Sequence, residues 1–210
     1  MGRLLAVMLV LFAVASCQND THAVFTPVPS PSPHTAPTAA ILQSGDMPAG
    51  LNVCLGSGPI DVYLSVLSGA DADLAARESN YWQLLRTEGA IAGAVSVFAA
   101  NATACKAELG VTINVKAMTS LVFQFRDEGQ AERGWESGVF GFAPPPPGQL
   151  SPSLIRGTST GLGPSSFTYD RPSVRLACWR RSVFVALVVV SNADLNAFHT
   201  ATAAIDPRLN

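Results

Sequence analysis

Apolar residues recur at helical spacing in three segments of the chain. The segment 71–89 repeats them every three to four positions, with Asp71 as a plausible N-cap and Gly89 as a stop signal. A more polar helix is predicted over 127–136. An amphipathic helix, capped by either Asn192 or Asp194, is predicted to close the domain over 194–205.

Four further segments have the pattern of strands. Residues 121–125 predict a strand, 91–99 a strand or a helix, and the β-branched segments 174–180 and 183–190 a hairpin joined by a short basic turn. The last of these is apolar at successive positions, which indicates a central strand covered on both sides. The predicted fold class is α+β, a single domain over 42–210 with helices packed on one face of a mainly antiparallel sheet.

The amino terminus has a different pattern. An apolar run over 4–14 follows Arg3 and ends in small residues before a cysteine, Val14-Ala15-Ser16-Cys17. This tetrapeptide resembles the lipobox of bacterial lipoproteins. The resemblance implies a signal peptide over 1–16 and a diacylglyceryl group on Cys17, and it places the mature protein at the extracytoplasmic face of the cell membrane. The run is too short for an ordinary transmembrane helix.

Residues 17–41 read as a tether between the anchor and the domain. They are rich in Pro, Ser and Thr and carry too little apolar area to offset the entropy of ordering. We interpret them as a disordered spacer, with a proline-rich ligand for a recognition domain as the alternative.

The charge balance argues against nucleic acid as a partner. Without the signal segment, the chain has 12 basic and 15 acidic residues, and its one tight basic pair, Arg180-Arg181, falls where the hairpin turn is predicted. The membrane, reached through the lipid on Cys17, is the partner that the sequence implies most directly.

Cysteine usage predicts one disulfide in the domain. Cys54, Cys105 and Cys178 remain after Cys17 is lipidated, which leaves three possible pairings. Cys178 alternates with Leu176 on one face of a predicted strand and is more simply a buried apolar residue. We therefore expect the pair Cys54 and Cys105, with Cys178 buried and free.

Residues for catalysis or metal binding are scarce. Two of the three histidines lie in the tether, which leaves His199, and no spacing of Cys or His typical of a zinc site occurs. Asp127, Glu128, Glu132 and Glu136 are predicted on exposed faces of one helix, as a solvated charged surface. The sequence predicts neither catalytic residues nor a metal or other cofactor.

A proline-rich loop is the candidate interaction site. The four residues Pro144, Pro145, Pro146 and Pro147 lack backbone donors and exclude a helix or a central strand. They would hold Phe140 and Phe142 at fixed positions, either exposed for recognition or folded back into the core while the prolines bridge a gap.

The leading functional expectation is a membrane-anchored extracytoplasmic lipoprotein with a non-catalytic binding, sensor or accessory role in the cell envelope. Its partner would be a cell-envelope protein or a small apolar ligand. The alternatives are a small-molecule or lipid carrier, which needs an internal cavity, and a cell-envelope hydrolase, which needs a cleft of perturbed titratable groups. The sequence leaves the question of enzymatic activity open.

Overall fold

A computed structural model describes residues 35–112, 114–146, 148 and 152–209. The predicted signal peptide, Cys17, the predicted tether up to residue 34 and Pro147 lie outside these residues. The described residues belong to one compact unit. Within them, we find no helix with both the length and the apolar character needed to span a membrane.

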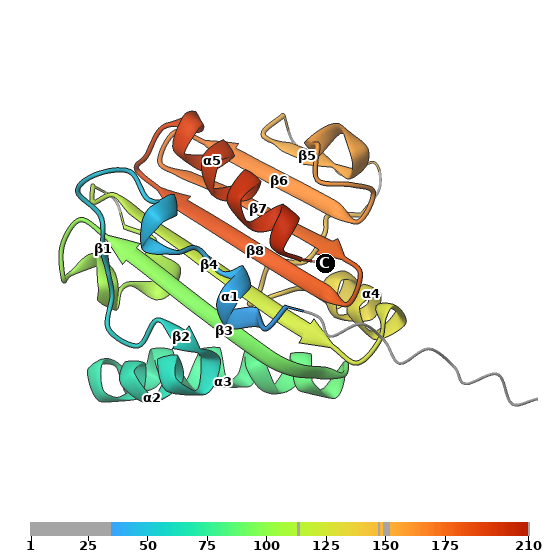
Figure 1. The fold of residues 1–210 in the computed structure, drawn as a ribbon, viewed down its shortest axis with the longest axis horizontal. Coiled ribbons are helices and arrows are strands. Elements are labelled where there is room, and N and C mark those ends of the chain that lie inside the picture. Colours follow the sequence, from blue (N-terminus) through green and yellow to red (C-terminus); the bar gives the residue numbers. More distant parts are fainter. Residues whose placement is uncertain (1–34, 113, 147, 149–151, 210) are drawn as a thin grey trace, which may run out of the picture. The chain divides into compact units, whose positions relative to one another are not determined.

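In the described part of the chain, eight strands form one antiparallel sheet (Figure 1). The strand order across the sheet is β1 (Asn52–Val53), β3 (Ala90–Ala99), β4 (Ala117–Phe125), β8 (Phe184–Ser191), β7 (Val174–Arg181), β6 (Ser166–Arg171) and β5 (Leu154–Arg156). The short strand β2 (Gly58–Pro59) also pairs with β3. The predicted hairpin is therefore confirmed as β7 and β8, at the centre of the sheet.

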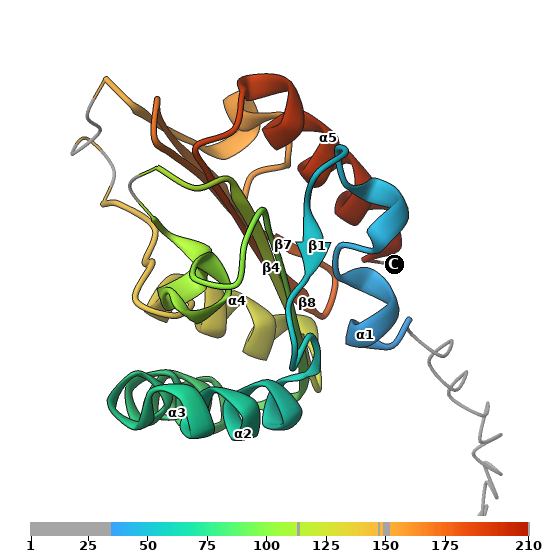
Figure 2. The ribbon, with the colours of Figure 1, turned by 90° about the vertical axis from the view of Figure 1, so that its left-hand side faces the viewer.

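Helices cover both faces of this sheet (Figure 2). One face packs against α2 (Ile60–Ala70), α3 (Ala72–Thr87) and α4 (Glu128–Ser137), and the other against α1 (Pro37–Ala40) and α5 (Leu195–Ile205). The predicted α+β class is confirmed. The prediction that helices pack on only one face of the sheet is wrong. The apolar run in β8 is the physical reason, because its side chains point alternately into two cores.

The predicted caps at Asp71 and Asp194 are present, and Asp127 caps α4 in the same way. The carboxylates of Asp71, Asp127 and Asp194 each accept a hydrogen bond from the backbone N–H three residues later, at 2.8 to 2.9 Å. Asp194 rather than Asn192 therefore caps α5. Each bond satisfies a backbone donor that the first helical turn leaves free.

Several elements were not predicted. The segment 91–99 is strand β3, one of its two predicted alternatives, but no helix was expected at α2 and no strand at β5 or β6. The folded part also begins before residue 42, because Ala40 and Ile41 are buried against the sheet. Short 3₁₀ helices complete the description: η1 (Ser44–Asp46), η2 (Ala104–Lys106), η3 (Glu108–Gly110), η4 (Gly157–Thr160) and η5 (Asp206–Arg208).

Candidate functional site

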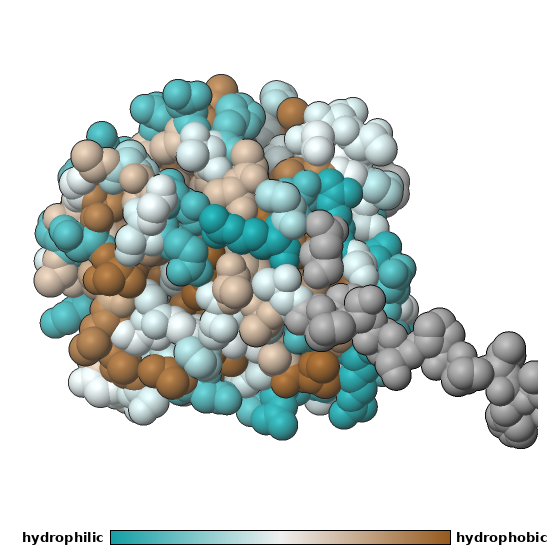
Figure 3. Space-filling model, viewed as in Figure 1, coloured by the Kyte–Doolittle hydropathy of each residue, from teal (hydrophilic) through white to brown (hydrophobic). Residues whose placement is uncertain are grey.

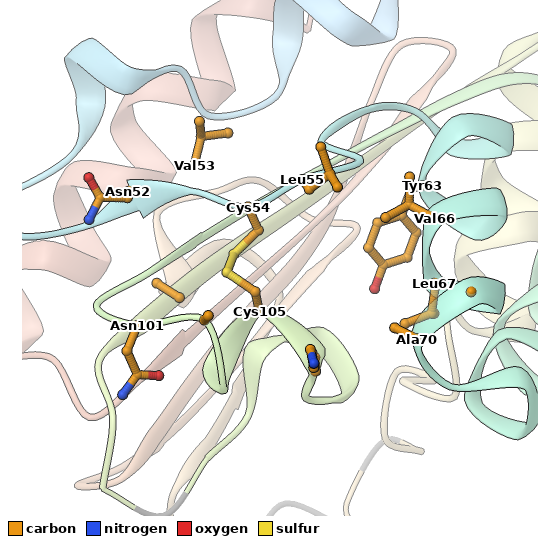
Figure 4. A pocket seen from close by; sticks show the side chains of 14 residues that line it. Asn52, Val53, Cys54, Leu55, Tyr63, Val66, Leu67, Ala70, Asn101 and Cys105 are labelled. Atoms are coloured by element: carbon orange, nitrogen blue, oxygen red, sulfur yellow. A yellow bond between two sulfur atoms is a disulfide. The ribbon is translucent and has the colours of Figure 1, made fainter.

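A pocket of about 550 Å³ opens between the segment that follows β1, the helix α2 and the 3₁₀ helix η2 (Figure 4). Its lining is mainly apolar. The apolar side chains come from two directions, Val53 and Leu55 from the β1 segment and Val66, Leu67 and Ala70 from α2. The volume falls within the range of about 300 to 1,000 Å³ that is usual for small-molecule sites.

A disulfide between Cys54 and Cys105 lies at the centre of the pocket (Figure 4). Its Cα atoms are 5.5 Å apart, and the bond ties the β1 segment to η2 across 51 positions of sequence. This pairing is the one that the sequence predicts. Cys178 is buried and free, and burial raises the pKa of its thiol well above the ordinary value. A buried thiol that stays protonated is a packing group rather than a nucleophile.

The apolar residues at the mouth of the pocket are unusually exposed. Leu55 is 85% exposed and Val53 is 56% exposed. Figure 3 shows apolar residues gathered over the region where β1, β2 and α2 meet. Exposed apolar side chains that adjoin a pocket are typical of a binding surface, whereas single ones elsewhere carry no such meaning.

The rim of the pocket is polar. Lys106 is the one lining residue with a charged side chain, and it forms no ion pair with any described residue. Asn52 and Asn101 complete the rim. The Oδ1 atom of Asn101 accepts a hydrogen bond of 3.1 Å from the backbone N–H of Ala104, so its amide nitrogen remains able to donate to a ligand.

Behind the pocket wall lies a buried carboxyl group. Glu78, on α3, is 1% exposed, and neither of its oxygens accepts a hydrogen bond of standard geometry from a described residue. Burial raises its pKa to about 7; the Tyr63 hydroxyl and Arg77 favour the ionised form, while Glu108 opposes it. Burial, and then the charge of Glu78, also raises the pKa of Tyr63, which lines the pocket. No local sequence pattern signals this pair, because Glu78 falls among other polar residues of α3.

In the candidate interaction loop, Phe140 folds back into the core, which is the second of the two alternatives, and is not exposed for recognition. Phe140 is 5% exposed, and its ring stacks on Phe123 with centroids 5.4 Å apart and contacts Tyr81 at 5.7 Å. Phe142 is partly buried against the same core. Reciprocal backbone hydrogen bonds between Val139 and Phe142, of 3.0 and 2.9 Å, form a tight turn that directs both rings inward. The Phe140 ring is therefore a core group and is not available for recognition.

The prolines of this loop differ from one another in exposure. Pro144 is buried, Pro145 is intermediate and Pro146 is exposed. The Arg156 guanidinium donates a hydrogen bond to the Pro145 carbonyl and lies over the ring of Trp135. The described part of the loop is thus fastened to the domain beside α4.

The carboxylates of α4 were predicted to form a solvated charged surface, but most of them take part in ion pairs. Glu128 and Glu132 pair with Arg180, and Glu136 lies 3.4 Å from Arg156, so three of the four carboxylates join the helix to the sheet. Arg181 forms two hydrogen bonds of 2.7 and 2.8 Å to Asp206. Both arginines lie at the end of β7 rather than in the turn where they were expected, and both are engaged in ion pairs.

The remaining candidates for chemistry are dispersed. His199 is exposed on α5, on the face of the sheet opposite the pocket. In the described ranges, no group of three or more His, Cys, Asp or Glu residues could hold a metal ion. The pocket offers apolar surface, one ammonium group, two amides and one phenol, a set that suits binding better than bond cleavage.

Comparison with known proteins gives no family for this chain. No protein family, no curated protein and no solved structure shows a significant match. The function is therefore inferred from the pocket and from the amino-terminal motif.

Proposed function

We propose that this protein is an exported, lipid-anchored binding domain with a non-catalytic role in the cell envelope, and that its binding site is the disulfide pocket. The ligand is small and mainly apolar. The observation that carries this proposal is the pocket of about 550 Å³, with apolar walls from the β1 segment and α2.

The energetics favour occupation of this pocket. Leu55 and Val53 hold apolar surface in water, and removing such surface from water contributes about 25 cal/mol per Å². The disulfide fixes the β1 segment, which carries Val53 and Leu55, to η2, so less conformational entropy is lost at this wall when a ligand binds.

The disulfide also supports export. Disulfides persist in oxidising compartments outside the cytoplasm, which agrees with the signal peptide and lipobox resemblance of residues 1–17. A diacylated Cys17 would keep the domain at the membrane, because two acyl chains give stable anchoring where one gives marginal binding.

Ligand binding can be tested with the purified domain and the fluorescent apolar probe N-phenyl-1-naphthylamine. We expect the probe to bind the wild-type protein and to be excluded by Ala70→Trp, which places a large ring at the pocket wall. Ala76→Trp is the matched control, because Ala76 is also exposed on a helix but does not line the pocket. Equal binding by all three proteins would show that the pocket is not the site.

Anchoring is tested separately by metabolic labelling with palmitate in the native host. The wild-type protein should incorporate the label and partition with membranes, and Cys17→Ser should remain an unlabelled precursor. Cys178→Ser serves as the control for loss of a thiol elsewhere. Label retained by Cys17→Ser would refute the lipobox interpretation without affecting the pocket.

A further inference from the structure

The size of the disulfide pocket limits how much of a ligand it can enclose. If each non-hydrogen atom takes about the liquid volume of one water, roughly 30 Å³, a pocket of 550 Å³ holds on the order of 18 such atoms. The apolar walls formed by Val53, Leu55, Val66 and Leu67 suit an extended or folded hydrocarbon chain. A single acyl chain fits this volume, and a complete two-chain lipid does not.

The charge at the rim sets the sign of the polar end. Lys106 is the one charged lining residue, and no carboxylate lines the pocket. The nearby Glu108 does not line it and is engaged by Arg77 at 3.3 Å. An ammonium group at the edge of an apolar surface, without a partner among the described residues, favours a ligand that carries its negative charge beside its apolar part.

The amide groups at the rim add to this preference. Asn101 has its Oδ1 committed to the backbone N–H of Ala104, so the side chain presents donor hydrogens to a ligand. Lys106 presents donors only, whatever its rotamer. Lys106 and Asn101 therefore offer hydrogen bonds to an acceptor-rich anionic head.

We propose that the ligand of the disulfide pocket is a single-chain anionic amphiphile, with its hydrocarbon chain against the apolar walls and its head group at Lys106. This inference rests on the proposed function and adds the ligand class to it. The shared chemistry is an acyl or alkyl chain with one carboxylate or phosphate head, so both a free fatty acid and a phosphate monoester satisfy it.

The test displaces N-phenyl-1-naphthylamine with four ten-carbon compounds, decanoate, decyl phosphate, 1-decanol and decyltrimethylammonium, each below its micelle concentration. In the wild-type protein, either anion should displace the probe at about tenfold lower concentration than the cation. Comparing decanoate with decyl phosphate identifies the preferred head group. Raising the salt concentration should reduce the difference in affinity between the anions and the cation, because the charge at the rim is exposed and therefore screened.

Lys106→Met supplies the decisive comparison. This substitution should lower the affinity for the two anions about fivefold and leave the affinity for 1-decanol within twofold of the wild-type value, because it removes the charge and keeps the length of the apolar side chain. Lys116→Met is the matched control, since Lys116 is the other lysine of the chain and does not line this pocket. Anion affinity within twofold of wild type in Lys106→Met, or a cation that binds wild type as tightly as the anions, would overturn the ligand class.

The two proposals fail in different ways. If 1-decanol displaces the probe and Ala70→Trp excludes it, the pocket binds apolar ligands, and a missing anion preference refutes the ligand class alone. If none of the four compounds displaces the probe and Ala70→Trp has no effect, the proposed function itself is refuted.

Discussion

The two faces of the sheet close their cores by different means. On the face that packs against α1 and α5, two bidentate ion pairs are present: Arg208 holds Asp46 at 2.8 Å and so joins opposite ends of the domain, and Arg181 holds Asp206. On the face that packs against α2, α3 and α4, a disulfide ties the β1 segment to η2, and the pocket opens beside it.

Buried polar groups are also treated differently on the two faces. Under α1, Ser120 accepts a hydrogen bond from the backbone N–H of Leu42 at 2.9 Å and shares another with Ser96 at 2.8 Å. On the pocket side, Glu78 is buried with neither oxygen hydrogen-bonded to a described residue. Buried polar groups without hydrogen bonds are often found near functional sites. This difference between the two faces therefore points to the pocket face as the functional one.

The largest expected effect breaks the pocket face directly. Replacing both Cys54 and Cys105 with Ala should lower the free energy of unfolding by about 4 kcal/mol, because the unfolded chain regains the entropy of a loop of 51 positions. Urea denaturation of the oxidised wild type and the double variant measures it. Cys178→Ala, the control, should lose less than half as much. A loss below about 1 kcal/mol in the double variant would show that the disulfide does not hold this face together.

A second prediction tests whether the pocket face has a rigid core beneath the pocket. Phe140→Ala should lower the free energy of unfolding by about 3 kcal/mol, because the ring is buried between Phe123 and Tyr81. Phe142→Ala should cost distinctly less, since that ring is only partly buried. Thermal or urea unfolding decides it. Unchanged stability in Phe140→Ala would return this loop to the surface and revive it as an interaction site.

The buried carboxyl group of Glu78 should make the stability of the pocket face fall between weakly acidic and neutral pH. Because the pKa of Glu78 is raised from 4.5 to about 7, the folded state favours the protonated form, and stability falls as the pH rises through 7. The wild-type protein should lose about 2 to 3 kcal/mol of unfolding free energy between pH 5 and pH 8.

Glu78→Gln should remove most of this pH dependence, whereas Glu136→Gln, which changes a half-exposed carboxylate, should keep it. Urea denaturation at several pH values gives the comparison. A wild-type profile that is flat from pH 5 to pH 8 would show that Glu78 is solvated or paired in solution.

The smallest expected effect concerns the opposite face. Asp46→Asn should cost about 1 to 2 kcal/mol at neutral pH, because it leaves the Arg208 guanidinium without its charged partner. Hydrogen bonds from Arg208 lower the pKa of Asp46, so this contribution is present above the ordinary value of 3.8 and is lost as the pH falls through the lower folded value.

Asp170→Asn is the control for the Asp46 substitution. It removes the more exposed carboxylate of another arginine pair, that of Arg175, and should cost less than half as much. Equal losses in the two variants at neutral pH would mean that the Asp46 pair has no special part in closing its face.

Local signals made much of the fold predictable. Asp71, Asp127 and Asp194 cap helices because a side-chain oxygen needs only the backbone N–H three residues ahead, an interaction that the sequence itself contains. The hairpin of β7 and β8 was predictable from a similarly local pattern, two β-branched segments joined by a short turn. The helix α2 was missed because Asp61, Ser65, Ser68 and Gly69 interrupt an otherwise apolar run and no side chain caps its first turn.

The sequence by itself determined the α+β class, the pairing of Cys54 with Cys105 and the expectation of an anchor at Cys17, because each depends on residue types in short or regular patterns. Only the tertiary structure decided that helices cover both faces, that Phe140 enters the core and that Glu78 is buried behind Tyr63. The pocket belongs to this second group. Its walls come from segments near residues 53, 67 and 105, and no local pattern states that chain segments so far apart in sequence will meet.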